Sequence, residues 1–329
     1  MKLNHLFQRT SKIDLFSLGE KRLAQLKAEG RYSCYRNTRA TLQKLAAFVG
    51  GKPLPLGKVT PELMESFRDY LINTVGNSHN TVAENIKILS RFFDEAGVRK
   101  NPCKGAALTR IQRPRSYLQE EELARMMALR LPKGSEMDVA RDIFFTECRT
   151  GLRISDLLQL RWCDFDGQYI RLKMQKTRRP VEIPVSASVQ KTLEKYHDLF
   201  SRPNSRIFPI LDRVKDRTDE FSPLRRLIYG TSHVNMLIKR VASRAGITKR
   251  VSTHVARHTF ATMLISKGAS IYDVKELLGH QDVKVTQVYA HLLDGRKREL
   301  VELLEGGDPG SGPGVRVVQS RNEGGVRVI

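Results

Sequence analysis

Apolar side chains recur every three or four residues along much of the first hundred positions, with polar side chains between them. This spacing is typical of amphipathic helices. It predicts helices that end before Gly30 and before Gly50, a third that begins at Thr60, and a fourth over residues 81–96. Thr60 suits a helix start because its hydroxyl can accept an amide hydrogen of the first turn. Four such helices can enclose one small core.

The pattern changes in the rest of the chain. Residues 98–116 are rich in proline, glycine and basic residues, which suits an exposed linker better than a regular element. Beyond them, residues 169–174 and 181–185 alternate between apolar and polar positions and predict a β-hairpin. The expected fold class is mainly α with a small antiparallel β-sheet. The helices are predicted over residues 137–150, 153–160, 187–199, 232–245, 253–267, 270–278 and 282–293.

The charge of the chain indicates what it binds. The 329 residues include 57 Lys and Arg against 35 Asp and Glu, so the formal net charge is +22. Residues 1–115 hold 21 of the basic and 9 of the acidic side chains, so the excess of positive charge per residue is higher there than in the rest of the chain. An excess of this size indicates an anionic partner, but it does not by itself distinguish nucleic acid from a membrane surface or an acidic protein.

Composition excludes several other classes of protein. With 40% apolar residues the chain can bury a core. No uncharged apolar stretch approaches the ~18 residues that span a bilayer, so we expect a cytoplasmic protein without a membrane partner. No metal-ligand or redox spacing joins the cysteines, so we expect no metal ion and reduced thiols at Cys34, Cys103, Cys148 and Cys163.

Several polar residues become informative only when they are taken together. Singly, each has an ordinary explanation, such as a helix cap, a solvated lysine or a core aromatic. They follow one another in an order that rarely occurs by chance. The order is an arginine on an early helix, a hairpin lysine, a His-x-x-Arg helix face, a Leu-Gly-His turn and a tyrosine nine residues after that histidine. These residues are Arg153, Lys176, His254, Arg257, His280 and Tyr289.

With these residues the sequence resembles the tyrosine recombinase (phage integrase) family, which includes the Xer and Cre recombinases. The likeness is strongest over residues 150–156 and 253–262 and from Leu277 to Tyr289. It implies a site-specific recombinase that cleaves and rejoins DNA strands through a 3′-phosphotyrosyl intermediate, for integration, excision or inversion of DNA. No cofactor is implied, because the tyrosyl bond conserves the energy needed for rejoining.

The resemblance also implies a division of the chain. A helical, SAM-like core-binding domain over residues 1–97 and an α+β catalytic domain over residues 117–305 would close as a C-shaped clamp around the duplex. Residues 98–116 would be the basic linker between them. Residues 306–329 would form a flexible tail rich in glycine and proline.

Each matched residue acquires a role from the resemblance. Tyr289 would attack the phosphate, while Arg153 and Arg257 would hold its nonbridging oxygens. Lys176 would protonate the departing 5′ oxygen, with Lys173 as the fallback. His254 would assist the transfer of the tyrosine proton. His280 would donate a hydrogen bond to the phosphate, and Asp156 would orient the catalytic groups without contacting the DNA.

Three neighbouring residues match no catalytic position of the family. His258 and His291 lie next to motif residues, and we interpret them as structural. Tyr272 competes with Tyr289 as nucleophile but is disfavoured because it precedes the Leu-Gly-His turn.

The implied partner is double-stranded DNA with inverted-repeat sites, bound by a homo-tetramer in the nucleoid, and the resemblance admits accessory DNA-bending proteins. Two other functions stay open: a type IB topoisomerase, which shares the chemistry but relaxes DNA alone, and a non-catalytic DNA-binding protein on an integrase scaffold. Basic residues expected to contact DNA are Arg36, Arg39, Lys87, Arg91, Arg113, Arg115, Arg178 and Arg179.

Overall fold

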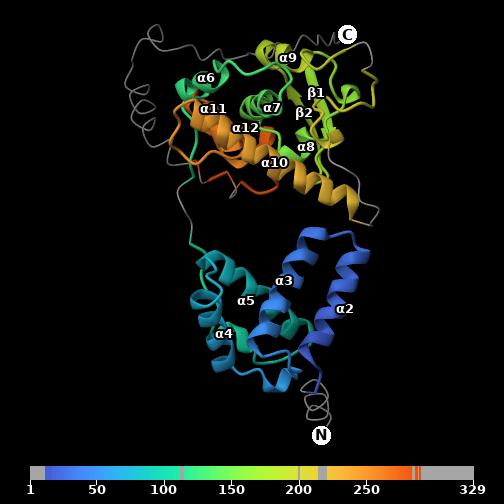
Figure 1. Cartoon of the computed structure of the whole chain (residues 1–329), viewed down its shortest axis with the longest axis vertical. Helices are drawn as coiled ribbons and strands as arrows, with labels where there is room; N and C mark the ends of the chain where they lie inside the picture. The colour runs from blue at the N-terminus through green and yellow to red at the C-terminus, as the bar shows by residue number, and fades with distance from the viewer. Residues whose placement is uncertain are drawn as a thin grey trace, which may run out of the picture.

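Four helices whose apolar faces meet form the first of two lobes (Figure 1). The computed structural model describes residues 12–111, 115–198, 201–213, 221–283, 286–287 and 289. Thr60 caps the third helix, because its hydroxyl accepts the amide hydrogen of Leu63 at 3.2 Å. The predicted helical front half is confirmed, and its helices are α2 (Leu15–Ala28), α3 (Tyr32–Phe48), α4 (Pro61–Asn73) and α5 (His79–Glu95).

One apolar core fills this lobe. Phe67 and Phe93 are fully buried in it. Short 3-10 helices, η1 (Leu56–Lys58) and η2 (Pro102–Lys104), follow α3 and α5 along the chain, and η2 packs on α4 and α5. Cys103 is buried in the same core. Part of the segment expected to be an exposed linker therefore belongs to the packing of the first lobe.

Helix α7 (Glu136–Thr150) is the centre of the second lobe. Most of its residues are buried, because α9, α10 and α11 all pack on it (Figure 1). None of the described helices combines the length and apolarity needed to cross a membrane. The other elements of this lobe are α6 (Glu120–Met127), α8 (Ile154–Leu157), η3 (Trp162–Asp164), α9 (Ala187–Glu194), η4 (Leu211–Arg213), α10 (Ser222–Arg244), α11 (Thr253–Ser266) and α12 (Ile271–Leu278).

Three helix boundaries differ from the prediction. Helix α9 ends at Glu194, before the predicted end at residue 199. Helix α8 has a single turn and ends before Leu160, whose carbonyl instead accepts a hydrogen bond at 2.9 Å from the amide of Ile207. Helix α10 begins ten residues before the predicted start at residue 232, because Pro223 stands in its first turn, where a missing amide hydrogen does no harm. The helix predicted over residues 282–293 lies largely outside the described residues.

The predicted hairpin is present as strands β1 (Tyr169–Lys173) and β2 (Pro180–Pro184), paired antiparallel. Ile170 lies opposite Ile183, and both are buried against the core of the second lobe. The turn between the strands is closed by hydrogen bonds at 2.9 Å, from the amide of Met174 to the carbonyl of Arg179 and from the amide of Arg178 to the carbonyl of Met174. The strand pairing ends at Lys173 and Pro180, so the basic residues between them lie in the turn beyond the sheet.

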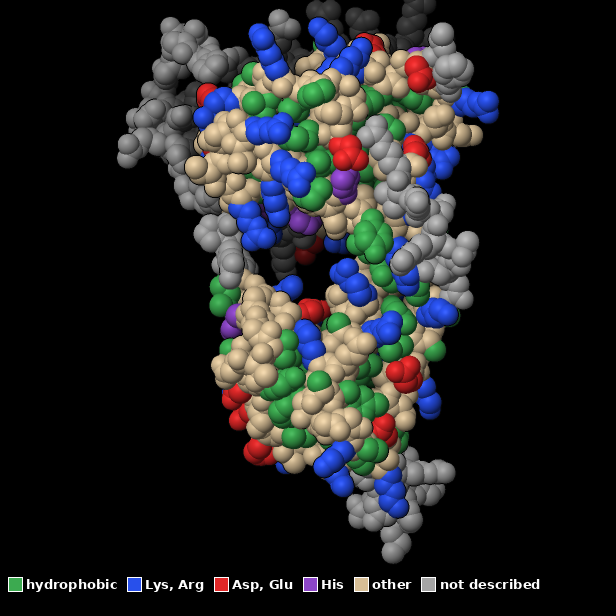
Figure 2. Space-filling model, in the orientation of Figure 1, with side chains coloured by type: hydrophobic (Ala, Val, Ile, Leu, Met, Phe, Trp, Pro, Cys, Tyr) green, Lys and Arg blue, Asp and Glu red, His purple; other side chains and the backbone are tan. Residues whose placement is uncertain are grey.

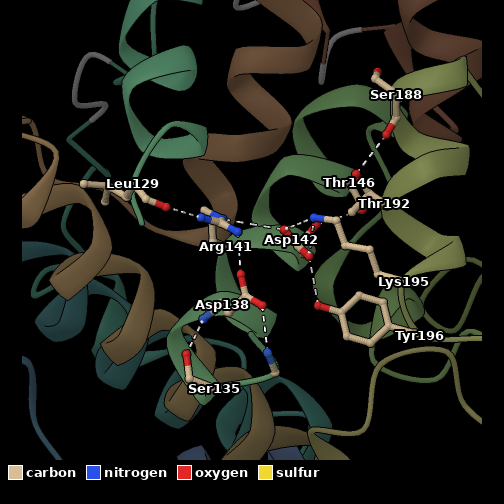
Figure 3. Close-up of polar contacts among 11 residues, drawn as sticks. Leu129, Ser135, Asp138, Arg141, Asp142, Thr146, Ser188, Thr192, Lys195 and Tyr196 are labelled. Carbon is tan, nitrogen blue, oxygen red and sulfur yellow. Dashed lines mark hydrogen bonds and ion pairs between the residues drawn. The ribbon is translucent and has the colours of Figure 1, made fainter. Parts of the chain in front are cut away.

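A buried carboxylate joins α7 to the end of α9 (Figure 3). Asp142 is fully buried, and it accepts hydrogen bonds from Lys195 at 3.1 Å and from the hydroxyl of Tyr196 at 3.0 Å. The guanidinium of Arg141 lies 3.6 Å from the same carboxylate and also pairs with Asp138. Such a buried charge is stable only while its partners remain, so this cluster holds α7 in place.

The two lobes also touch on the side away from the connecting chain (Figure 1). The ring of Phe221, just before α10, lies 4.9 Å from the ring of Tyr32 and 5.4 Å from that of Tyr35, both on α3. Arg225 stacks over Tyr32 at 5.4 Å. Figure 2 shows an opening between the lobes with Lys and Arg side chains around it.

Candidate active site

Arg153 stands where α7 turns sharply into α8. Gly151 ends α7 in the left-handed conformation (φ 65°), and a methyl group there would lie 2.4 Å from the ring of Phe260. Glycine is therefore required for the end of α7 to approach α11 so closely. The turn leaves Arg153 partly buried, with its Nη1 3.0 Å from the sulfur of Met174.

Arg257 on α11 ties three segments of the site together. The residue is 8% exposed, and its guanidinium donates to the carbonyl of Gly151 and, at 3.1 Å, to the carbonyl of Leu278. Burial and the neighbouring charge of Arg153 lower the pKa of Arg257 to about 10. Arg257 therefore remains charged at neutral pH, and the two guanidinium groups lie close enough to repel each other.

A carboxyl group that the sequence analysis did not identify lies near these arginines. Glu147 on α7 is buried, and burial raises its pKa although the charge of Arg257 acts in the opposite direction. One of its oxygens has no hydrogen-bond partner among the described residues. The signal in the sequence was an acidic residue in an apolar stretch, next to Phe144, Phe145 and Cys148.

Asp156 holds the hairpin turn that carries Lys176. The amide of Gln175 donates to the carboxylate of Asp156 at 2.8 Å. Asp156 is buried, and burial raises its pKa against the opposing effects of this hydrogen bond and of Arg153. Lys176 is exposed, and its charge helps to lower the pKa of both His254 and His280. Lys173, at the end of β1, lines a hollow beside η3 that Asp156 and Gln175 also line.

His280 follows the sharp end of α12. Gly279 adopts the left-handed conformation (φ 59°), and a methyl group there would lie 2.5 Å from the side chain of Met174. The Nδ1 of His280 lies 2.9 Å from the hydroxyl of Thr286, and its Nε2 lies 3.4 Å from the Nη2 of Arg257. Burial, followed by the charges of nearby arginines, lowers the pKa of His280 to about 4, so the ring is neutral at pH 7.

Tyr289 is 4% exposed and lies against α11. Its hydroxyl forms a hydrogen bond with the Nδ1 of His258, and the two ring centroids are 5.7 Å apart. Burial raises the pKa of Tyr289, while Arg115, which also hydrogen-bonds the phenol, and Arg257 lower it. The structure thus brings Tyr289 to one of the two matched arginines. The competing Tyr272 is 69% exposed on α12.

The two histidines of α11 differ in their relation to Tyr289. His254, expected to assist the tyrosine proton, keeps an exposed edge, and partial desolvation of its ring, followed by the charge of Arg257, lowers its pKa. The ring that contacts the Tyr289 hydroxyl is that of His258, which the sequence analysis interpreted as structural. Its position one residue after Arg257 gave no sign of this contact. His291 lies outside the described residues.

The basic residues expected to contact DNA occur in both lobes. Every described member of the set is exposed, and Arg113 lies outside the described residues. Figure 2 shows basic side chains on both sides of the opening between the lobes. The described members are Arg36, Arg39, Lys87, Arg91, Arg115, Arg178 and Arg179.

A tyrosine beside paired arginines, histidines and an exposed lysine is suited to phosphoryl transfer without a metal. Residues 116–296 match the phage integrase family, and residues 14–102 match the phage integrase SAM-like domain. A tyrosine recombinase of Thermosipho africanus is 31% identical over 232 residues, which cover 68% of this chain and 76% of that protein.

Solved structures show the same fold. The Tn1549 transposon integrase in complex with a circular intermediate DNA matches with a TM-score of 0.64 at 17% identity, covering 88% of this chain and 99% of that one. A λ integrase tetramer bound to a Holliday junction matches with a TM-score of 0.61 at 19% identity, covering 84% and 77%. The chain belongs to the phage integrase family of tyrosine recombinases, and its function is site-specific DNA recombination.

Proposed function

We propose that the chain cleaves DNA by forming a covalent bond between Tyr289 and a 3′ phosphate, the chemistry that type IB topoisomerases also use. The observation that supports this most is the burial of the Tyr289 hydroxyl within the electrostatic reach of Arg257. In such a place a phenol can meet a phosphate that the arginine already holds. The bond conserves the energy of the broken strand, so rejoining needs no cofactor.

Arg153 and Arg257 would bind the nonbridging oxygens of the phosphate. A guanidinium presents its donors in a planar fork that suits a phosphate better than an ammonium does. In the transition state these oxygens gain negative charge, which two fixed positive groups stabilise more than they stabilise the ground state. His280 would donate one further hydrogen bond in the tautomer that carries its proton on Nε2, with Nδ1 accepting from the hydroxyl of Thr286.

Lys176 would donate a proton to the departing 5′ oxygen. Its place in a hairpin turn lets it follow the DNA, and Asp156 fixes the base of that turn through Gln175. Lys176 is a stronger candidate than Lys173 because its charge acts on both His254 and His280. His254, at the exposed edge of the site, would contact the phosphate backbone.

The two lobes would act as a clamp on double-stranded DNA. We assign residues 1–97 to core binding, 98–116 to the linker, 117–305 to catalysis and 306–329 to a tail. Exposed basic residues on both sides of the opening support this arrangement (Figure 2). Exchange of strands between inverted-repeat sites would take place in a homo-tetramer on chromosomal or mobile-element DNA in the cytoplasm.

The test is covalent capture on nicked duplexes, in which the cleaved fragment diffuses away and traps the adduct. The duplexes are tiled across the DNA on either side of the gene, where inverted repeats are expected. We expect a denaturation-resistant adduct with the wild type and none with Tyr289→Phe. Binding without an adduct would identify a non-catalytic protein, and adduct with plasmid relaxation but no strand exchange would identify a topoisomerase.

A further inference from the structure

The proton of the Tyr289 hydroxyl has one acceptor among the described residues. The phenol oxygen contacts the guanidinium of Arg115, which can only donate, and the Nδ1 of His258. Both contacts come from distant parts of the chain, the segment that enters the second lobe and helix α11. Since the oxygen accepts from Arg115, its own hydrogen points to His258.

The protonation states agree with this direction. Burial, then Arg115, His254 and Arg257, lowers the pKa of His258 to about 4, so its ring is neutral at pH 7 and one nitrogen has a free lone pair. Burial raises the pKa of Tyr289, so the phenol keeps its proton in the absence of DNA. A nucleophile that is protonated at the working pH needs a base to attack efficiently.

We propose that His258, rather than His254, is the general base that removes the proton of Tyr289 during DNA cleavage. The proposal rests on the proposed function. The proton passes from the phenol oxygen to Nδ1 of His258 as the bond between that oxygen and phosphorus forms. The bond between phosphorus and the 5′ oxygen breaks, and that oxygen takes a proton from Lys176. Rejoining reverses each transfer.

Bound DNA would make His258 a better base. Its pKa is low partly because Arg115 and Arg257 disfavour a further positive charge. A phosphate between the arginines brings negative charge that opposes this effect and shifts the pKa of the ring upwards, towards the working pH. Arg115 would at the same time stabilise the phenolate oxygen as it forms.

The first experiment separates the base from the acid. It uses the nicked duplex that gives the adduct and the same duplex with sulfur in place of the bridging 5′ oxygen, since a thiolate leaves without a proton. We expect Lys176→Ala to lose cleavage of the oxygen substrate and regain it with sulfur. His258→Gln, which keeps a polar side chain but cannot take the proton, should lose about 10²- to 10⁴-fold on both. His197→Ala, an exposed histidine beside Trp162, is the matched control and should cleave like the wild type.

The second experiment is the pH profile of cleavage by His258→Gln. Without the base, hydroxide must supply the phenolate, so the rate should rise about tenfold per pH unit over a range in which the wild type is flat. A variant that is merely misfolded would cleave slowly at every pH. That outcome, as well as rescue of His258→Gln by sulfur, would contradict the assignment.

Failure of the inference can be told from failure of the proposed function. If His258→Gln and His258→Ala both cleave within about twofold of the wild type while Tyr289→Phe is inactive, the base is elsewhere and the tyrosine chemistry stands. If Tyr289→Phe forms the adduct, both proposals are wrong.

Discussion

Replacement of Asp156 by alanine tests whether the hairpin turn is held for catalysis. The carboxylate is buried and accepts the amide hydrogen of Gln175 at 2.8 Å, directly before Lys176. Alanine removes the only described contact between this carboxylate and the turn. Because burial raises the pKa of Asp156, its ionised form does not favour folding at neutral pH, so the variant should remain folded.

The size of the effect follows from that hydrogen bond. A hydrogen bond to a charged group contributes about 1.5–3 kcal/mol. If the turn holds Lys176 in place for the proton transfer, the same free energy is lost from the transition state. At about 1.4 kcal/mol per tenfold change in rate, cleavage should slow by about 10- to 150-fold.

The assay is single-turnover cleavage of the nicked duplex with oxygen or with sulfur at the bridging position. Asp156→Ala should be slow with oxygen and nearly normal with sulfur, because only the proton on the leaving oxygen depends on Lys176. Asp156→Asn keeps an acceptor oxygen and should lose less than Asp156→Ala. Equal losses of Asp156→Ala on both substrates, or no loss on either, would refute the argument that Asp156 acts through the turn.

Four further predictions concern stability and binding. Asp142→Ala removes the buried acceptor of Lys195 and Tyr196 and one of the two carboxylates beside Arg141. It should lower the free energy of unfolding by about 3–5 kcal/mol in thermal or urea denaturation, while an unchanged midpoint would contradict the role given to this cluster. Gly151→Ala should lower the free energy of unfolding through backbone strain and through about 1–3 kcal/mol of overpacking against α11. Gly134→Ala is the control, because Gly134 has a φ of 71° but nothing within 4 Å of an added methyl group, so it should show the strain alone. Equal losses of stability in the two variants would exclude the clash with α11. His258 is half-buried, and its pKa is lowered from 6.5 to about 4. The folded state therefore binds fewer protons than the unfolded state, and the free energy of unfolding should fall as pH decreases through this range, less so in His258→Gln; calorimetry at several pH values checks the sign. The logarithm of the DNA binding constant should fall linearly with the logarithm of salt concentration, and each of Arg36→Ala and Arg39→Ala should reduce the slope by about 0.9; an unchanged slope would remove that residue from the phosphate contacts.

Local rules were enough to predict most of the helices and the hairpin. The spacing of apolar residues marks the faces that meet in the two cores, and turn glycines such as Gly97 and Gly279 mark helix ends. The start of α10 was missed because Pro223 and the residues after it carry a weak apolar pattern, although proline in a first turn is itself a start signal.

The candidate site was less predictable than the helices. The motif order identified residues that the fold does bring together, since Arg257 bonds to Gly151 and Leu278, which are far apart in the sequence. It could not show that His258 faces Tyr289, because this contact depends on which face of α11 packs against the segment that contains Tyr289. The contact of Arg115 depends likewise on the path of the connecting segment, which no local pattern determines.

The charge balance of the candidate site suits it to a phosphate. Four cations lower the pKa of His280 together with its burial, which places them all within electrostatic reach of one ring. The buried carboxyls of Glu147 and Asp156 offset this charge only partly, because burial raises the pKa of each and so disfavours its ionised form. A phosphate diester would relieve the repulsion among the cations. The free energy released should make the cleaved phosphate bind more tightly than the other phosphates of the DNA. The gain should be largest in the transition state, in which the phosphate oxygens carry more negative charge. These cations are Arg115, Arg153, Lys176 and Arg257.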